Sequence, residues 1–239
     1  FINIFCIKII YKVIFCFKII MHISVQNLIN IENKIKSNLS DLNIQNLPNI
    51  IAVSKTFKLD NILPLIEHGH LDFGENKIQE AIDKWSEIKN KKPELKLHMI
   101  GKLQTNKVKS AVRLFDFIHS VDSEKLAKKI ADEQSKIKKN IKIFIQVNIG
   151  NEAQKSGIDQ SSTKNLILFC KELGLDVIGL MCIPPVNIDP NNYFKKMNEI
   201  NKSFKFSELS MGMSSDYIEA ARNNSSYLRI GSSIFGQRI

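Results

Sequence analysis

The sequence predicts an α/β fold, namely a single (β/α)8 TIM barrel with an extra N-terminal helix. Its 239 residues, 44% of them hydrophobic, suffice for one sizeable core, and barrels of this class commonly reach this length as one domain. Eight short apolar segments alternate with helical segments, as a barrel requires. The competing architecture, a doubly wound open sheet, usually has fewer strands and a G-x-G-x-x-G turn, which this sequence lacks.

The predicted strands are short runs of β-branched and other apolar residues that end on polar or small residues. We expect them at residues 50–55, 71–73, 95–100, 115–121, 141–147, 177–181, 208–211 and 227–230. Segments this short and this apolar are typical of strands that are buried on both faces.

The predicted helices follow from apolar residues at helical spacing and from capping residues. We expect them at residues 24–39, 60–67, 78–88, 104–114, 123–134 and 161–173, from residue 190 onward, and at 216–222. Ser24 and Asp60 are expected as N-caps. Asp189 is a further N-cap, followed by Pro190 at the first helical position. Trp85 is expected to pack its helix against the sheet.

The N-terminal segment, residues 1–20, is apolar but is interrupted by Lys8, Lys12 and Lys18. These lysines disfavour a transmembrane helix, and the segment lacks the small-residue cleavage site of a signal peptide. We therefore expect Met21 to be the natural start and residues 1–20 to be translated upstream sequence outside the fold, with 21–239 as the barrel domain. A membrane anchor is the alternative for this segment.

The net charge and the spacing of cysteines and histidines limit the kinds of partner and cofactor that we expect for this protein. The net charge is +10, but the basic residues are spread along the chain with one dense run, 136–142, which a composition-biased genome explains better than a nucleic-acid surface. The four cysteines include no C-x-x-C pair, and the five histidines form no metal-binding motif. We expect a reducing cytosol and no metal.

The leading candidate for a functional residue is Lys55, which follows the apolar strand that begins at Ile50. An ammonium group at the mouth of such a strand is partly desolvated, and this favours the neutral amine. The neutral amine can attack an aldehyde and form a Schiff base. The alternative is an ordinary solvated lysine in a loop.

Functional groups of a barrel collect at the C-terminal ends of its strands. In this chain those ends carry Lys55, Glu75 with Asn76, Gly101, Asn148, Ser210, and Arg229 with Gly231. Two loops there, 210–214 and 229–233, place serine and glycine where barrels often bind phosphate, although tight packing would use the same residues. A Schiff-base lysine and a phosphate loop on one rim suit pyridoxal 5′-phosphate.

Seven segments carry a resemblance to a known family. They are residues 52–56 (AVSKT), 72–76 (DFGEN), 98–107 (HMIGKLQTNK), 146–149 (QVNI), 179–185 (GLMCIPP), 209–214 (LSMGMS) and 229–236 (RIGSSIFG). In this order and spacing the chain resembles the pyridoxal phosphate homeostasis protein family, the YggS/PROSC group, which is related to the N-terminal barrel of alanine racemase. The resemblance covers about residues 21–238. Lys102 stands where histidine is frequent, and Cys182 and Ser232 stand where threonine is usual; none of these departures removes a cofactor contact.

The resemblance implies a role for each residue of the candidate site. Lys55 would form the internal aldimine with pyridoxal phosphate, and Arg229 would face the pyridine nitrogen. The other implied cofactor-binding residues are Asn76, Ser210, Ser214, Gly231 and Ser232, of which Asn76 would lie near the ring and the rest at the phosphate. Because arginine only donates hydrogen bonds, it would keep the ring nitrogen unprotonated, which disfavours transaminase or decarboxylase chemistry.

The implied function is cofactor handling without robust catalysis. Alanine racemases bring a tyrosine from a C-terminal β domain of the partner subunit, and no tyrosine of this chain lies in a matched segment. We expect a cytosolic monomer that binds pyridoxal 5′-phosphate and buffers it or delivers it to apoenzymes, with no catalytic residue, metal, nucleic-acid or membrane partner. The alternatives are an amino-acid racemase that uses Lys55 as a base and a basic nucleic-acid-binding protein.

Overall fold

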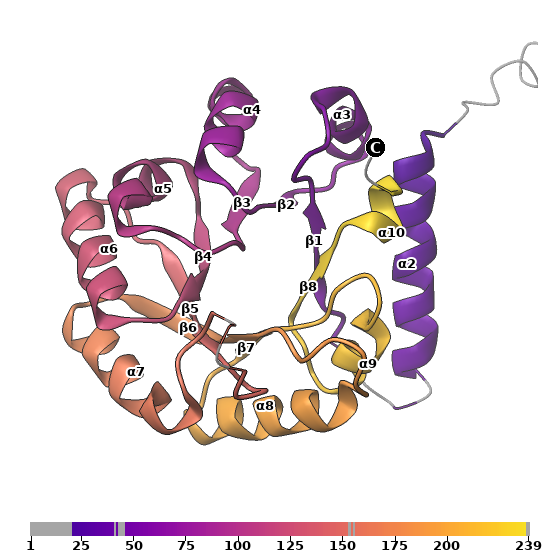
Figure 1. The fold of residues 1–239 in the computed structure, drawn as a ribbon. Coiled ribbons are helices and arrows are strands. Elements are labelled where there is room, and N and C mark those ends of the chain that lie inside the picture. The colour runs from indigo at the N-terminus through magenta and orange to yellow at the C-terminus, as the bar shows by residue number, and fades with distance from the viewer. Residues whose placement is uncertain (1–20, 41, 43–45, 153, 155, 238–239) are drawn as a thin grey trace, which may run out of the picture.

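The computed structural model describes residues 21–40, 42, 46–152, 154 and 156–237. Eight parallel strands form a closed barrel in sequence order, and β1 pairs with β8 to close it. Helices surround the strands on the outside (Figure 1). The predicted (β/α)8 barrel is thereby confirmed, whereas the expectation for residues 1–20 lies outside the described residues.

The element bounds follow the predicted ones closely. The strands are β1 Asn49–Val53, β2 Asp72–Glu75, β3 Lys96–Met99, β4 Phe117–Val121, β5 Lys142–Val147, β6 Asp176–Cys182, β7 Glu208–Ser210 and β8 Tyr227–Ile230. The helices are α2 Ile23–Ser40, α3 Leu59–Glu67, α4 Ile78–Lys91, α5 Val108–Leu114, α6 Glu124–Ile137, α7 Thr163–Glu172, α8 Asn191–Ser203, α9 Tyr217–Arg222 and α10 Ser232–Phe235. Short 3₁₀ turns, Thr105–Lys107 and Gln160–Ser162, precede α5 and α7, and α10 was not predicted. Over the part of the chain described, no helix combines the length and the apolarity needed to cross a membrane.

Three predicted N-caps are wrong, each by one or two positions. Ser24 lies inside the first turn of α2, because helical bonding already starts at the carbonyl of residue 22. Asp60 lies in the first turn of α3, where its negative charge still suits the helix dipole. Pro190 occupies the N-cap of α8, and the Asp189 carboxylate reaches past it to accept the N–H of Asn191 at 3.0 Å.

The strands separate two cores. The larger core lies between the strands and the helices and includes the fully buried Trp85, as predicted. A second core fills the barrel interior with Ile51, Phe117, Phe144, Met181 and Tyr227. Because alternate strand residues face the same side, polar residues two positions away from these reach the same interior. Phe117 and Tyr227 are followed two positions later by the buried His119 and Arg229, and hydrogen bonds join the buried His98 and Ser210 to these two side chains.

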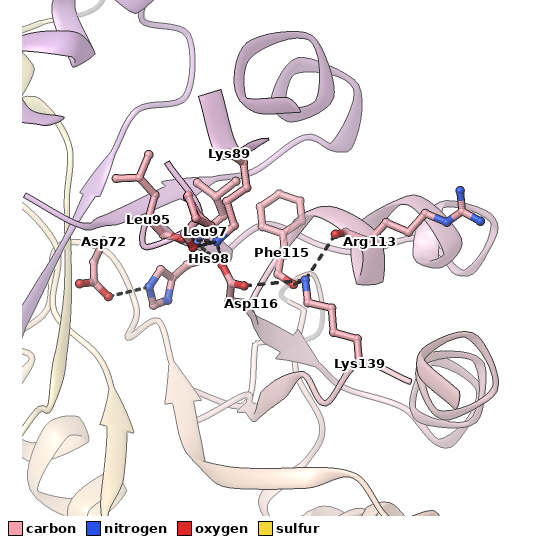
Figure 2. Close-up of polar contacts among 10 residues, drawn as sticks. Asp72, Lys89, Leu95, Leu97, His98, Arg113, Phe115, Asp116 and Lys139 are labelled. Atoms are coloured by element: carbon pink, nitrogen blue, oxygen red, sulfur yellow. Dashed lines mark hydrogen bonds and ion pairs between the residues drawn. The ribbon is translucent and has the colours of Figure 1, made fainter. Parts of the chain in front are cut away.

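A polar cluster ties the N-terminal ends of β3 and β4 to the outer helices (Figure 2). The Asp116 carboxylate accepts the N–H of Leu97 at 2.9 Å and pairs with Lys89 at 2.7 Å and Lys139 at 3.7 Å. Lys136 pairs with Glu133 at 2.9 Å. Two lysines of the basic run 136–142 are thus engaged by carboxylates of the fold itself.

Candidate functional site

The turn that carries Lys55 follows β1 and is held from outside by α4. The N–H of Thr56 donates to the Glu80 carboxylate, and the Lys84 ammonium donates to the Ser54 carbonyl at 2.8 Å. Thr56 has a φ of 69°, a left-handed conformation that is a genuine outlier for a β-branched residue. Such strain persists only where the surroundings enforce it, so α4 fixes the position of Lys55.

Lys84 also belongs to a buried ionic cluster behind the turn. Glu75 is fully buried, and its Oε1 accepts hydrogen bonds from Ser54 Oγ at 2.7 Å, Lys84 Nζ at 2.9 Å and Trp85 Nε1 at 2.9 Å. Lys84 also contacts Glu80 at 3.0 Å. Glu75 therefore points outward to α4 and is not one of the groups that open onto the rim. Glu80 and Lys84 were not predicted, because their i, i+4 spacing is typical of any exposed helix pair.

Asn76, the next residue, lies against the loop after β3. A Cβ added at Gly101 would lie 2.3 Å from the Asn76 carbonyl oxygen, so only glycine allows this approach. The Asn76 Oδ1 atom is buried and has no hydrogen-bond partner among the described residues. A buried acceptor without a donor is costly, by about 1–3 kcal/mol.

The loops after β7 and β8 meet at Ser214. Its hydroxyl oxygen accepts the N–H of Gly231 at 3.2 Å and the N–H of Ser233 at 3.3 Å. Two backbone N–H groups that converge on one oxygen form the kind of concavity that binds anions. Ser232, between them, is exposed, so its hydroxyl is accessible from solvent. The predicted phosphate loops are therefore brought together by the fold.

This concavity lies beside the Lys55 turn. Ala52 of β1 pairs with Ile230 of β8, and a Cβ at Gly231 would lie 3.3 Å from the carbonyl oxygen of Val53. Farther out, Phe57 stacks on Phe235 with ring centroids 4.9 Å apart. The Lys55 turn and the two converging N–H groups therefore share one sector of the C-terminal rim.

Arg229 lies one layer deeper, in the barrel interior. Its Nη1 donates to Ser210 Oγ at 2.6 Å and its Nη2 donates to the Cys182 carbonyl at 2.9 Å. Burial lowers the pKa of the Arg229 guanidinium, and the carboxylate of Asp216 is among the groups that oppose this shift. The Ser210 hydroxyl also contacts His119 Nδ1 at 2.9 Å, so both of its hydrogen bonds are with protein groups. Its expected contact with a phosphate stays a prediction.

The remaining groups named from the sequence serve the fold. Asn148 closes its own loop, since its amide donates to the Glu152 carbonyl at 2.9 Å and accepts the Glu152 N–H at 3.2 Å. Burial raises the pKa of the Cys182 thiol to about 12, which keeps it protonated. Within the described ranges, no group of three or more His, Cys, Asp and Glu side chains is arranged to hold a metal ion.

The chain is similar to known proteins over most of its length. Residues 31–239 match the family described as alanine racemase, N-terminal domain. The pyridoxal phosphate homeostasis protein of Haemophilus influenzae is 34% identical over 224 residues, which cover 89% of this chain and 94% of the relative. The human protein of that name is 35% identical over 212 residues, covering 80% of this chain and 77% of its own.

Solved structures extend the comparison to the fold. PipY of Synechococcus elongatus, solved with PLP bound, is 32% identical and has a TM-score of 0.74, covering 84% of this chain and all (100%) of PipY. An alanine racemase of Clostridium difficile is 14% identical and has a TM-score of 0.65, and the match covers 86% of this chain and 57% of the racemase chain. At this identity the similarity shows the fold alone. The chain belongs to the pyridoxal phosphate homeostasis protein family, whose barrel is that of the alanine racemase N-terminal domain.

Proposed function

We propose that this protein binds pyridoxal 5′-phosphate, holds it as a Schiff base on Lys55, and buffers it or delivers it to apoenzymes that require it. The observation that carries the proposal is the convergence of the Gly231 and Ser233 N–H groups on Ser214, one strand away from the Lys55 turn. An amine and an anion site on one sector of the rim match the two ends of this cofactor.

The residues present fit the cofactor at three points. Gly231, Ser232 and Ser214 would bind the phosphate, and the Ser214 hydroxyl, which accepts the Gly231 and Ser233 N–H groups, would donate its hydrogen to a phosphate oxygen. The unpaired Oδ1 of Asn76 offers an acceptor to a polar substituent of the ring. Arg229 would face the ring nitrogen, and Ser210 would contribute by holding the guanidinium from behind.

Arg229 limits the chemistry of the site. When bound, the cofactor supplies an aldehyde that condenses with amines and a ring that withdraws electrons, most strongly when its nitrogen is protonated. Arg229 can only donate, so the ring nitrogen would have to accept its N–H and would therefore carry no proton of its own. The site thus suits retention and exchange of the cofactor better than the carbanion chemistry of transamination.

An amino-acid racemase is the second candidate, because the fold is that of alanine racemase. The names of the relatives favour homeostasis over racemisation. Tyr227 lies in the barrel interior, and burial raises its pKa to about 12, so it is not suited to remove a proton from a substrate. We propose a cytosolic monomer whose partners are the cofactor and the apoenzymes that receive it.

The experiment is a spectroscopic titration with pyridoxal 5′-phosphate. The wild-type protein is expected to develop a Schiff-base absorbance band, Lys55→Ala to develop none, and Lys58→Ala, an exposed lysine of the same loop, to behave as wild type. Absence of the band in the wild type would refute the Schiff base on Lys55. Racemisation of amino acids at ordinary enzymatic rates that depends on Lys55 would instead support the second candidate.

A further inference from the structure

A chain of hydrogen-bonded side chains crosses the barrel interior from one end to the other. At the N-terminal end, the Asp72 carboxylate contacts His98 Nε2 at 3.0 Å, as Figure 2 shows. The other nitrogen of that ring, His98 Nδ1, lies 2.9 Å from His119 Nε2. His119 Nδ1 lies 2.9 Å from Ser210 Oγ, which in turn accepts a hydrogen bond from Arg229 at 2.6 Å.

The carboxylate end of this series of side chains dictates the direction of its hydrogen bonds. An ionised carboxylate can only accept, so His98 must carry its proton on Nε2 and accept at Nδ1. His119 must then donate from Nε2 and accept at Nδ1, which leaves Ser210 as the donor to it. From the opposite end, Arg229 can only donate to Ser210, which is compatible with this arrangement because it leaves the Ser210 hydrogen for His119.

The surroundings keep both imidazoles neutral. His98 stacks on Phe117 with ring centroids 4.2 Å apart, and His119 stacks on Phe144 at 4.3 Å. Both imidazoles are fully buried, and burial lowers the pKa of His98 and lowers that of His119 well below the usual value. Partial burial opposes the ionisation of Asp72, but the hydrogen bond from His98 helps to lower its pKa below the usual value. The series of hydrogen bonds therefore connects the Asp72 carboxylate to the Arg229 guanidinium through neutral side chains.

We infer that Asp72, His98, His119 and Ser210 are positioning residues that act on the cofactor site through Arg229. Aligned hydrogen bonds polarise one another, so the negative charge of Asp72 strengthens each bond up to the guanidinium and holds it in one orientation. This inference rests on the proposed function, in which Arg229 faces the cofactor ring.

This series of hydrogen-bonded side chains is a fixed support for Arg229 and not a path for protons. A proton that entered at His98 could move as far as Ser210, but Arg229 has no acceptor and would block any further transfer. Asp72, by contrast, is accessible: together with His70 it lines a cavity of about 400 Å³ at the N-terminal end of the barrel. The charge that supports Arg229 is therefore located at the end of the barrel opposite the proposed cofactor.

The test combines the imidazole protons of the cofactor-free protein with cofactor affinity. Nitrogen-15 NMR is expected to show His98 and His119 neutral and protonated on Nε2 in the wild type. Asp72→Asn keeps an acceptor but removes the charge, so the His98 Nε2 proton should move upfield and affinity for pyridoxal phosphate should fall about 2- to 30-fold. Asp176→Asn is the matched control, because Asp176 also begins a barrel strand and its side chain has no hydrogen bond among the described residues.

Two results would overturn the inference. One is a proton on Nδ1 of His119 in the wild type, because His119 would then donate to Ser210 and accept from His98, the opposite of the inferred directions. The other is an affinity of Asp72→Asn equal to that of Asp176→Asn, with urea unfolding used to confirm that both variants are folded. Failure of the wild type to bind any cofactor would refute the proposed function instead, and the imidazole protons of the cofactor-free protein would still decide the direction of the chain.

Discussion

Lys84 is the cation that connects the Lys55 turn to the buried acid behind it, and its replacement by methionine tests that connection. Methionine retains most of the side-chain volume but removes the ammonium. The change deletes the bonds to the Ser54 carbonyl at 2.8 Å, to Glu75 at 2.9 Å and to Glu80 at 3.0 Å. Glu75 is left as a buried carboxylate without its cation.

The expected loss of stability follows from the burial of the pair. Removal of one partner from a buried ion pair costs about 3–5 kcal/mol, because the other charge stays buried and unpaired. The Lys84 side chain is 8% exposed and that of Glu75 is fully buried, so this range applies. Glu75 keeps its hydrogen bonds from Ser54 and Trp85, which places the loss near the lower end, at about 3 kcal/mol. Cofactor affinity should fall as well, since the turn loses a contact at Ser54.

Urea unfolding at neutral pH measures the effect. Lys91→Met is the control, because the ion pair of Lys91 with Glu87 is exposed on the same helix. Its removal should not change the free energy of unfolding measurably. Glu75→Gln combined with Lys84→Met should lose less than the two single variants together, because no charge is then buried alone. The reasoning is refuted if Lys84→Met is as stable as Lys91→Met, or if the two single losses simply add.

Three further predictions concern the interior and the rim. The free energy of unfolding should fall as pH drops below 6.5, because burial lowers the pKa of His119 and only the unfolded protein then binds a proton at this imidazole. His119→Gln should flatten this dependence, measured by urea unfolding at several pH values. An unchanged slope would contradict the prediction. Gly101→Ala should destabilise the fold by about 1–3 kcal/mol and weaken cofactor binding, because the added Cβ collides with the Asn76 backbone; wild-type values in both assays would count against it. Ser214→Ala should weaken cofactor binding about tenfold, whereas its exposed neighbour Ser215→Ala should not, by equilibrium titration; equal affinities would rule out the phosphate contact.

The fold was predictable because each of its units is specified locally. Strand β8 was expected at 227–230 and is found at Tyr227–Ile230, since turn residues bound a short apolar run on both sides. The N-caps were less predictable, because neighbouring polar groups compete for the same free N–H groups. The Asp189 carboxylate, for example, reaches the first N–H of α8 from beyond Pro190.

The rim of the site was predictable, but the groups that support it were not. Lys55, Gly231 and Ser214 follow strands at positions that any parallel barrel brings together. His98 and His119 are 21 residues apart in no recognisable motif, and they meet only because β3 and β4 are neighbours whose inward faces coincide. The hydrogen bonds of Ser210 inside the barrel could not be predicted, because a three-residue strand is too short to show the alternation that turns this side chain inward.

The most direct measurement is to locate the cofactor on the chain. The protein loaded with pyridoxal 5′-phosphate is reduced with borohydride, digested, and analysed by mass spectrometry. The account predicts that the reduced cofactor is attached to the peptide containing Lys55, and that the same treatment of Lys55→Ala leaves every peptide unmodified. Attachment to a different lysine, or an unmodified Lys55 peptide in protein that has bound the cofactor, would contradict the central claim.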